Sequence, residues 1–143
     1  MSHHNLRLVG YIRTGDTHVT ADEQRKMITD HCEKYGHHLV GFTHVDMEKP
    51  QYGLPEALAA LQEDDGIIAM DLDRFVRHPE DRLLDLRPLI QQFMHSGKVL
   101  VTVKEGIETR SAAGQQRVND FLSEWFDRDN VTMHATSDRA THQ

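Results

Sequence analysis

The sequence predicts an α/β domain in which a mostly parallel sheet of four to five strands lies between helices on both of its faces. Short apolar runs of strand length alternate with segments of helical spacing, the order that produces parallel sheets. The chain has 143 residues, enough for one domain and its core but not for two. Hydrophobic residues make up 38% and charged residues 27%, a balance typical of soluble globular domains.

The first half of the chain alternates twice between a strand and a helix. Residues 6–12 and 38–45 are apolar runs of strand type. Between them, Thr20 and Glu23 make a capping box that opens a helix, and Gly36 is well placed to end it. The next helix is short and carries a leucine stripe: Leu54, Leu58 and Leu61.

The second half repeats this alternation. Residues 66–70 and 99–103 are short apolar runs typical of central parallel strands. A longer helix begins at Pro79, and Pro88 inside it should kink or interrupt the helix because proline has no backbone N–H. This helix is expected to turn five apolar side chains inward: Leu83, Leu86, Ile90, Phe93 and Met94.

A last helix at roughly residues 111–126 completes the predicted domain, which spans residues 1–126. Residues 127–143 are polar and lack periodicity, so we expect a frayed tail. The helix carries one apolar stripe: Val118, Phe121, Leu122, Trp125 and Phe126. Aromatic side chains are enriched in the cores of protein interfaces. Two interpretations of the stripe stay open, a contact with a second copy or another protein, and packing on its own sheet.

Charge and cysteine content restrict the functional classes. The net charge is −7, whereas proteins bind DNA largely through Lys and Arg that neutralise phosphates. We therefore expect DNA binding by this domain to be weak or to depend on a partner. The single cysteine, Cys32, cannot form an internal disulfide and fits a small buried side chain in a reducing compartment. No segment has signal-peptide or transmembrane character, which predicts a cytoplasmic protein without membrane contact.

The eleven histidines do not predict a metal centre. The pairs at residues 3–4 and 37–38 are the most visible clusters, but H-E-x-x-H and Cys/His ligand spacings do not occur. Histidines on the surface explain them better. We expect neither a metal nor a cofactor.

Two polar clusters follow strands of the predicted sheet. Tyr11 and Arg13 end the first strand, and Asp73, Arg74 and Arg77 follow the third. If these strands are neighbours, three guanidinium groups converge at one edge of the sheet. The rigid N–H fork of arginine matches phosphate oxygens, so the trio predicts a phosphate or other anion site. In the alternative interpretation, nearby aspartates pair with the arginines as a purely structural network: Asp46, Asp71 and Asp73.

The motifs of this chain, in their order, resemble those of serine recombinases of the resolvase/invertase type. They are Gly10-Tyr11-Ile12-Arg13-Thr14, Gln24, Asp46, Gly53-Leu54, Leu72-Asp73-Arg74-Phe75-Val76-Arg77 and Glu105-Gly106-Ile107-Glu108-Thr109. The resemblance covers roughly residues 6–122. It implies a resolvase-like three-layer fold whose arginines surround the scissile phosphate of DNA. By resemblance, seven residues form an anion pocket: Tyr11, Arg13, Gln24, Asp46, Asp73, Arg74 and Arg77.

The chain departs from that family's pattern at three places. The family's nucleophile is a serine two residues after the Y-x-R arginine, and this chain has Gly15 there, which has no hydroxyl to activate. Gln51 lies in the loop where the family places a further arginine, so one stabiliser of the transition state is missing. Residues 127–130 are polar and acidic, where active relatives continue a basic helix and a DNA-binding domain. We therefore expect that the chain has lost DNA cleavage and independent binding of duplex DNA.

Three functional hypotheses follow. The first is a non-catalytic relative that acts as a regulatory or partner-binding module, as a homodimer or higher homo-oligomer, with the arginine pocket either retained or a relic. The second is a DNA recombinase or strand-cleaving enzyme of altered mechanism, in which Thr14 or Thr17 replaces the serine or a partner supplies DNA binding. The third, a receiver-like signalling domain, needs an acidic cluster where this chain has Tyr11 and Arg13.

Overall fold

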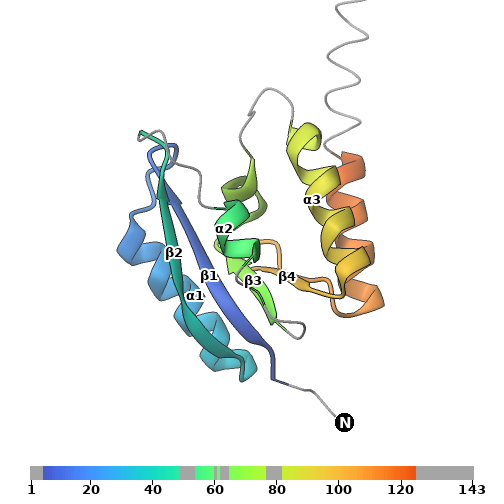
Figure 1. The fold of residues 1–143 in the computed structure, drawn as a ribbon, viewed down its shortest axis with the longest axis horizontal. Helices are drawn as coiled ribbons and strands as arrows, with labels where there is room; N and C mark the ends of the chain where they lie inside the picture. Colours follow the sequence, from blue (N-terminus) through green and yellow to red (C-terminus); the bar gives the residue numbers. More distant parts are fainter. Residues whose placement is uncertain (1–4, 49–53, 60, 62–64, 77–81, 125–143) are drawn as a thin grey trace, which may run out of the picture.

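A computed structural model describes residues 5–48, 54–59, 61, 65–76 and 82–124. Its elements follow in the order β1 (Arg7–Thr14), α1 (Ala21–Tyr35), β2 (His38–Asp46), α2 (Leu54–Ala59), β3 (Asp65–Ala69), the 3-10 helix η1 (Leu72–Phe75), α3 (Arg82–Ser96), β4 (Val99–Thr102) and β5 (Ile107–Glu108). Residues 112–124 then form a further helix (Figure 1).

The five strands form one sheet in the order β2-β1-β3-β4-β5. All neighbouring strands run parallel except β5, which pairs antiparallel with β4. The predicted α/β fold class is therefore confirmed. Because β1 lies directly beside β3, the carboxyl ends of these two strands meet at the same edge of the sheet.

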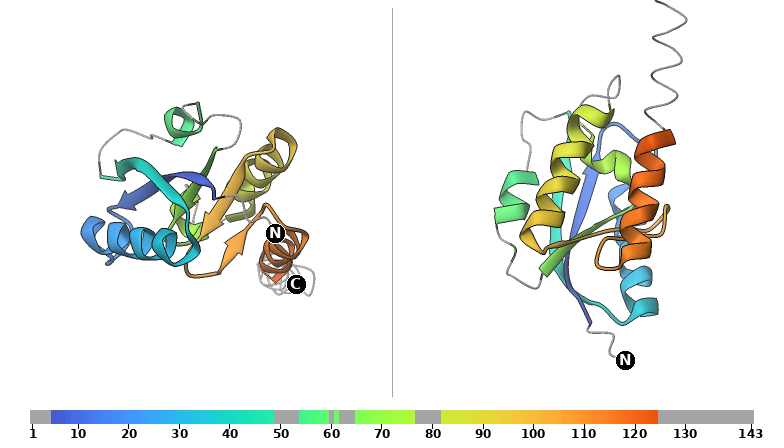
Figure 2. Two further views of the ribbon diagram at one scale, coloured as in Figure 1. Left: turned by 90° about the horizontal axis from the view of Figure 1, so that it is seen from below. Right: turned by 90° about the vertical axis from the view of Figure 1, so that its right-hand side faces the viewer.

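Both faces of the sheet are covered by helices, with α1 on one side and α2 and α3 on the other (Figure 2). Successive residues of β3 alternate between the two cores: Ile67 packs in the cluster with α2 and α3, and Ile68 packs in the cluster with α1. A strand buried on both faces needs apolar residues at every position, which explains the continuous apolar run in the sequence.

Helix α1 follows its sequence signals closely. Thr20 is the N-cap and forms a complete capping box with Glu23, and Gly36 ends the helix. The residues of α1 that face the sheet recur every fourth position: Gln24, Ile28 and Cys32. A polar residue, Gln24, therefore shares the buried face with two apolar ones.

The structure excludes one of the two effects expected of Pro88 and corrects the expected position of one apolar side chain of α3. The helix continues from Arg82 to Ser96 through Pro88, so the proline does not interrupt it. The missing N–H removes one hydrogen bond, but the turns on either side are held by buried side chains, among them Leu86 and Ile90. Met94 does not point inward either, because 38% of it is exposed, and Leu89 fills the core instead.

The helix at 112–124 packs closely against the strand before it. A Cβ added at Gly114 would lie 1.6 Å from the carbonyl oxygen of Glu108 in β5. Only glycine permits this approach of helix to strand. Val118 is consequently brought into the core that α2 and α3 share.

No helix in the described part of the chain is long and apolar enough to cross a membrane.

Candidate functional site

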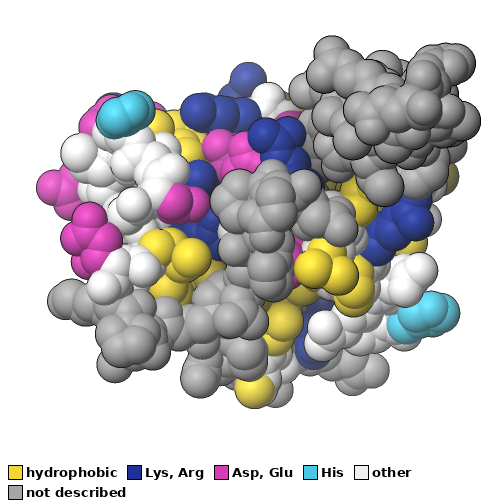
Figure 3. All heavy atoms as spheres, turned by 90° about the horizontal axis from the view of Figure 1, so that it is seen from above, with side chains coloured by type: hydrophobic (Ala, Val, Ile, Leu, Met, Phe, Trp, Pro, Cys, Tyr) yellow, Lys and Arg dark blue, Asp and Glu magenta, His cyan; other side chains and the backbone are white. Residues whose placement is uncertain are grey.

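The two polar clusters predicted from the sequence meet at the carboxyl edge of the sheet. Arg13 lies near the end of β1, and Arg74 lies in η1, directly after β3. Figure 3 looks onto this edge, where the side chains of Lys or Arg and of Asp or Glu lie next to one another. The condition for convergence, that β1 and β3 are neighbours, is met.

Arg13 is almost fully enclosed, with 2% of its surface exposed. Its Nη2 donates hydrogen bonds to Oδ2 of Asp16 at 2.6 Å and to the carbonyl oxygen of Asp73 at 2.7 Å. Its Nε and Nη1 are buried and have no hydrogen-bond partner among the residues that the structure describes. Burying unpaired donors costs free energy, so the guanidinium has capacity for further acceptors.

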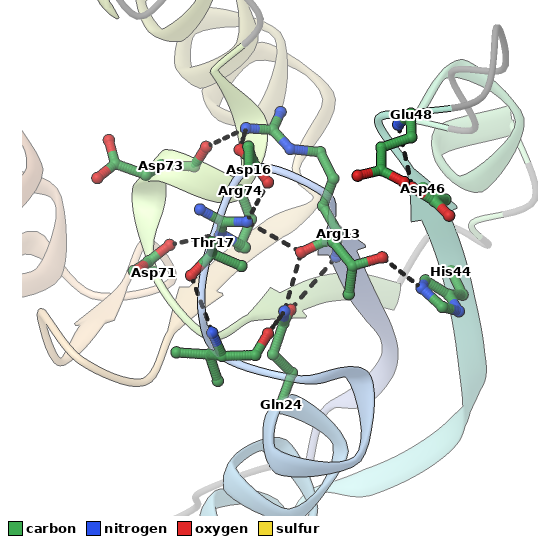
Figure 4. Close-up of polar contacts among 12 residues, drawn as sticks. Arg13, Asp16, Thr17, Gln24, His44, Asp46, Glu48, Asp71, Asp73 and Arg74 are labelled. Atoms are coloured by element: carbon green, nitrogen blue, oxygen red, sulfur yellow. Dashed lines mark hydrogen bonds and ion pairs between the residues drawn. The ribbon is translucent and has the colours of Figure 1, made fainter.

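Arg74 approaches from the other strand end and is 4% exposed. Its Nη1 donates to Oδ1 of Asp16 at 2.8 Å and to the carbonyl oxygen of Arg13 at 2.9 Å. Its Nε pairs with Oδ1 of Asp71 at 3.1 Å. Both guanidinium groups are therefore held together by backbone oxygens and carboxylates (Figure 4).

Asp16 is the residue that joins the two arginines, because each of its carboxylate oxygens accepts from a different guanidinium. Burial on its own raises the pKa of Asp16, but the hydrogen bonds and charges of Arg13 and Arg74 outweigh it and hold the pKa below its ordinary value. Asp16 is therefore ionised at neutral pH. Asp16 was not among the residues predicted for the pocket, although an aspartate two residues beyond β1 was the available signal.

Gln24 positions the site through the backbone. Its Nε2 donates to the carbonyl oxygen of Arg13 at 2.9 Å and to that of Val19 at 3.1 Å, and its Oε1 accepts from the N–H of Arg13 at 3.3 Å. The amide thus ties together both ends of the loop at residues 15–18. Gln24 therefore fixes the backbone of the predicted pocket.

Three other predicted pocket residues have different positions. Tyr11 is fully buried and its ring stacks on Phe75 of η1, with centroids 5.2 Å apart, so it packs β1 against η1. The carboxylate of Asp46 accepts from the N–H of Glu48 at 3.0 Å and makes no ion pair with Arg13 or Arg74 in the described structure. The backbone carbonyl oxygen of Asp73 accepts a hydrogen bond from Arg13, while the carboxylate of Asp73 lies 3.6 Å from Nε of Arg82. Arg77 and Gln51 lie outside the described residues.

Glu105 in the turn between β4 and β5 holds η1 from the side. Its Oε2 accepts from the N–H of Leu72, the first residue of η1, at 3.2 Å. Burial raises the pKa of Glu105, and the hydrogen bond from Leu72 opposes that shift only in part. This contact fixes the start of the turn that carries Arg74.

Gly15 has a left-handed backbone, with φ at 96°. A Cβ added there would lie 3.1 Å from Oδ1 of Asp46 and from the N–H nitrogen of Met47. Both the backbone conformation and the tight surroundings disfavour any residue with a side chain.

The two nearest hydroxyl groups are engaged elsewhere. Oγ1 of Thr14 lies 3.0 Å from Nε2 of His44 on β2. Oγ1 of Thr17 accepts from the N–H of Val19 at 3.3 Å, within the loop itself. Among the described contacts, neither hydroxyl bonds to Arg13 or Arg74.

The apolar stripe of the last helix lies partly in the core. Val118 has no exposed surface and is not available to a partner in this fold, which agrees for this residue with the second interpretation of the stripe, packing on its own sheet. Phe121 and Leu122 are half-buried against the same core. Trp125 and Phe126 lie outside the described residues.

Comparison with known proteins identifies the family of this chain. The family model described as the resolvase N-terminal domain matches residues 8–138. The chain belongs to the resolvase family. The receiver-like interpretation was therefore wrong, and the resemblance seen in the sequence is confirmed. No curated protein matches the chain.

Solved structures show the same fold. The chain is similar to the N-terminal catalytic domain of TP901-1 integrase, with a TM-score of 0.60 and 18% identity over 86% of this chain and 97% of the other. It is also similar to a resolvase family site-specific recombinase from Streptococcus pneumoniae, with a TM-score of 0.61 and 13% identity over 93% and 95% of the two chains. At these identities, the likeness establishes the fold of this resolvase-family chain.

Proposed function

We propose that this member of the resolvase family does not cleave DNA and acts as a regulatory or partner-binding module that forms homo-oligomers. The observation that carries the proposal is Gly15 at the place of the family's nucleophile. A glycine cannot form a covalent link to a phosphate. Its left-handed φ and the atoms around it also leave no relaxed place for a serine.

The arginine pocket supports the same proposal. Arg13 and Arg74 carry two positive charges, and Asp16 and Asp71, which pair with them, carry two negative ones. The formal charge of these four groups is therefore zero. Stabilising a phosphate transition state needs uncompensated cations or donors aimed at the developing charge.

One contact favours the alternative, a strand-cleaving enzyme of altered mechanism. A threonine hydroxyl beside a histidine nitrogen, as in Thr14 and His44, is the kind of pair that yields an activated nucleophile. However, side chains alternate across a strand, so Thr14 shares a face with Ile12 and Arg13 shares the opposite face with Tyr11. Ile12 packs in the α1 core and Tyr11 in the α2 and α3 core. The hydroxyl and the arginine pocket therefore face opposite sides of the sheet.

The decisive experiment is a search for a covalent protein–DNA adduct. The chain is incubated with nicked, duplex and single-stranded DNA, and the mixture is separated on a denaturing gel beside the variants Gly15→Ser and Thr14→Val. We expect no adduct from the natural sequence. An adduct that Thr14→Val abolishes would overturn the proposal in favour of a threonine enzyme, and one that persists would overturn it by another route.

Self-association is tested by light scattering. Removal of the chain after residue 111 would take the buried Val118 out of the core, so point substitutions are the sharper test. We expect a mass above that of the monomer, which falls when Trp125 and Phe126 are replaced by alanine. Replacement of the exposed Leu84 by alanine is the control for a general loss of apolar surface. A strictly monomeric mass for the natural chain contradicts the homo-oligomer.

A further inference from the structure

We propose that Asp16 is a built-in competitor for the arginine pocket, so that an oxyanion from outside, such as a phosphate group, binds only by displacing the Asp16 carboxylate. This inference goes beyond the proposed function, because it assigns a class of ligand to the arginine pocket. It adds the group that controls access to that site.

The geometry of Asp16 is that of a bound ligand. One carboxylate oxygen lies 2.6 Å from Nη2 of Arg13 and the other lies 2.8 Å from Nη1 of Arg74. A phosphate group bridges two arginines in the same way, with separate oxygens on separate guanidinium groups. The side chain of Asp16 therefore occupies the position where two oxygens of an external anion would bind.

The exposure of the three groups permits exchange. The side chain of Asp16 is 32% exposed, whereas Arg13 and Arg74 are 2% and 4% exposed. The carboxylate thus forms the outer layer and can leave without opening the core. Asp16 lies in a bend that begins at Gly15 and belongs to no helix or strand, so backbone rotation there breaks no ladder hydrogen bond.

The pocket also has donors that a carboxylate leaves unused. Nε and Nη1 of Arg13 are enclosed and unpaired within the described structure. A phosphate offers more acceptor oxygens than the two of a carboxylate, and it carries a larger charge. Once Asp16 has left, Arg13, Arg74 and Asp71 together carry a net positive charge. The site then attracts an anion that it does not attract when closed.

Tethering explains why the closed state dominates. Gln24 holds the carbonyl oxygens of Arg13 and Val19, so both ends of the short loop that carries Asp16 are fixed. A group held on a short tether meets its partner at a high effective concentration. A free anion must exceed that concentration, or bind more strongly, to take the place of Asp16.

The test is a titration with inorganic phosphate, followed by calorimetry and by the NMR signals of the arginine Nε–H groups. We expect Asp16→Asn to bind phosphate roughly ten- to hundred-fold more tightly than the natural chain, the effect of removing one charged hydrogen-bond competitor. Asp16→Ala is measured as well, because an asparagine still fills the space. Asp22→Asn is the matched control, since Asp22 pairs with Arg25 on the surface of α1 and is unrelated to the pocket.

The outcomes separate the role of Asp16 from the existence of the anion pocket. Equal phosphate affinity in the natural chain and in both Asp16 variants overturns the role of Asp16 but leaves the anion pocket in place. Absence of binding in all variants overturns the pocket and the competitor together. If the double variant Asp16→Asn/Arg74→Gln still binds phosphate as tightly as Asp16→Asn alone, the phosphate is an adventitious ion bound outside the pocket. That result also overturns the inference. Thermal melts of each variant confirm that the chains compared are folded.

Discussion

Arg74 donates a hydrogen bond from Nη1 to the backbone carbonyl oxygen of Arg13, at 2.9 Å and across 61 positions of the sequence. This bond joins the ends of β1 and β3 without any ligand. Two buried cations are thereby kept side by side in the free protein, which requires the carboxylates of Asp16 and Asp71 for compensation. The charge network is for this reason a part of the fold as well as a candidate site.

Replacing Arg74 by alanine should destabilise the domain by about 3–5 kcal/mol, because it leaves buried partners without their cation. Urea unfolding measures the loss. Arg74→Lys should retain only part of the stability, since a single ammonium cannot serve acceptors on three sides. Arg25→Ala removes a surface pair with Asp22 and should change stability by less than about 1 kcal/mol. An equal effect at positions 25 and 74 would show that burial of the network is unimportant.

Replacing Gly114 by alanine should cost at least about 1–3 kcal/mol, because the added methyl group would overlap the carbonyl oxygen of Glu108. Gly41→Ala is the matched control, since a Cβ at position 41 has no neighbour within 4 Å. Thermal melts of the two variants give the comparison. If Gly114→Ala has the same melting temperature as the natural chain, the last helix does not pack on β5 as described.

The Cys32 thiol should be almost inert in the native state. Burial raises its pKa to about 11, and only the thiolate reacts readily with alkylating reagents. Iodoacetamide at pH 8 should therefore modify the folded chain far more slowly than the chain in urea, as followed by mass spectrometry. Similar rates in both conditions would place Cys32 outside the α1 core.

Glu105 should make the domain less stable as the pH rises. Its pKa is raised in the folded state, so the folded chain holds a proton that the unfolded chain releases at a lower pH. The contribution of Glu105 to the free energy of unfolding is fully present below the ordinary pKa of 4.5. It is lost as the pH rises through the pKa of the folded state. Glu105→Gln removes this titration and should flatten the fall in melting temperature as the pH rises above 4.5. Exposed Glu33→Gln is the control, and parallel curves for all three chains would contradict the assignment.

Local signals accounted for much of the fold. The capping box of Thr20 and Glu23 defined α1, and the apolar runs gave the strands, because both depend on nearby residues alone. Pro88 does not interrupt α3, because packing on both sides of a proline can outweigh its missing hydrogen bond. Met94 lies four residues after Ile90, a spacing that favours the same helical face, but the buried face of α3 is the one that also includes Leu89.

The two arginines of the site and the pairing of Asp71 were predictable from the sequence, whereas Asp16 was not. Arg13 and Arg74 end neighbouring parallel strands, so strand order alone brings them together. The position of Asp16 depends on a loop whose course is set by the left-handed φ of Gly15, which no periodic pattern reveals. Gln24 was predicted in the pocket only by resemblance, and neither its burial beside Ile28 and Cys32 nor the two carbonyl groups it binds were predicted.

The conformation of Gly15 matters for any attempt to engineer DNA cleavage into this scaffold. Supplying a hydroxyl at position 15 asks a residue with a Cβ to remain at a φ of 96°, at a cost of roughly 1–2 kcal/mol. It also asks the turn at Asp46 and Met47 to move outward, because their atoms stand 3.1 Å from the new carbon. Reactivation is thus a problem of redesigning two adjoining loops together, and a single exchange of glycine for serine is not a sufficient design.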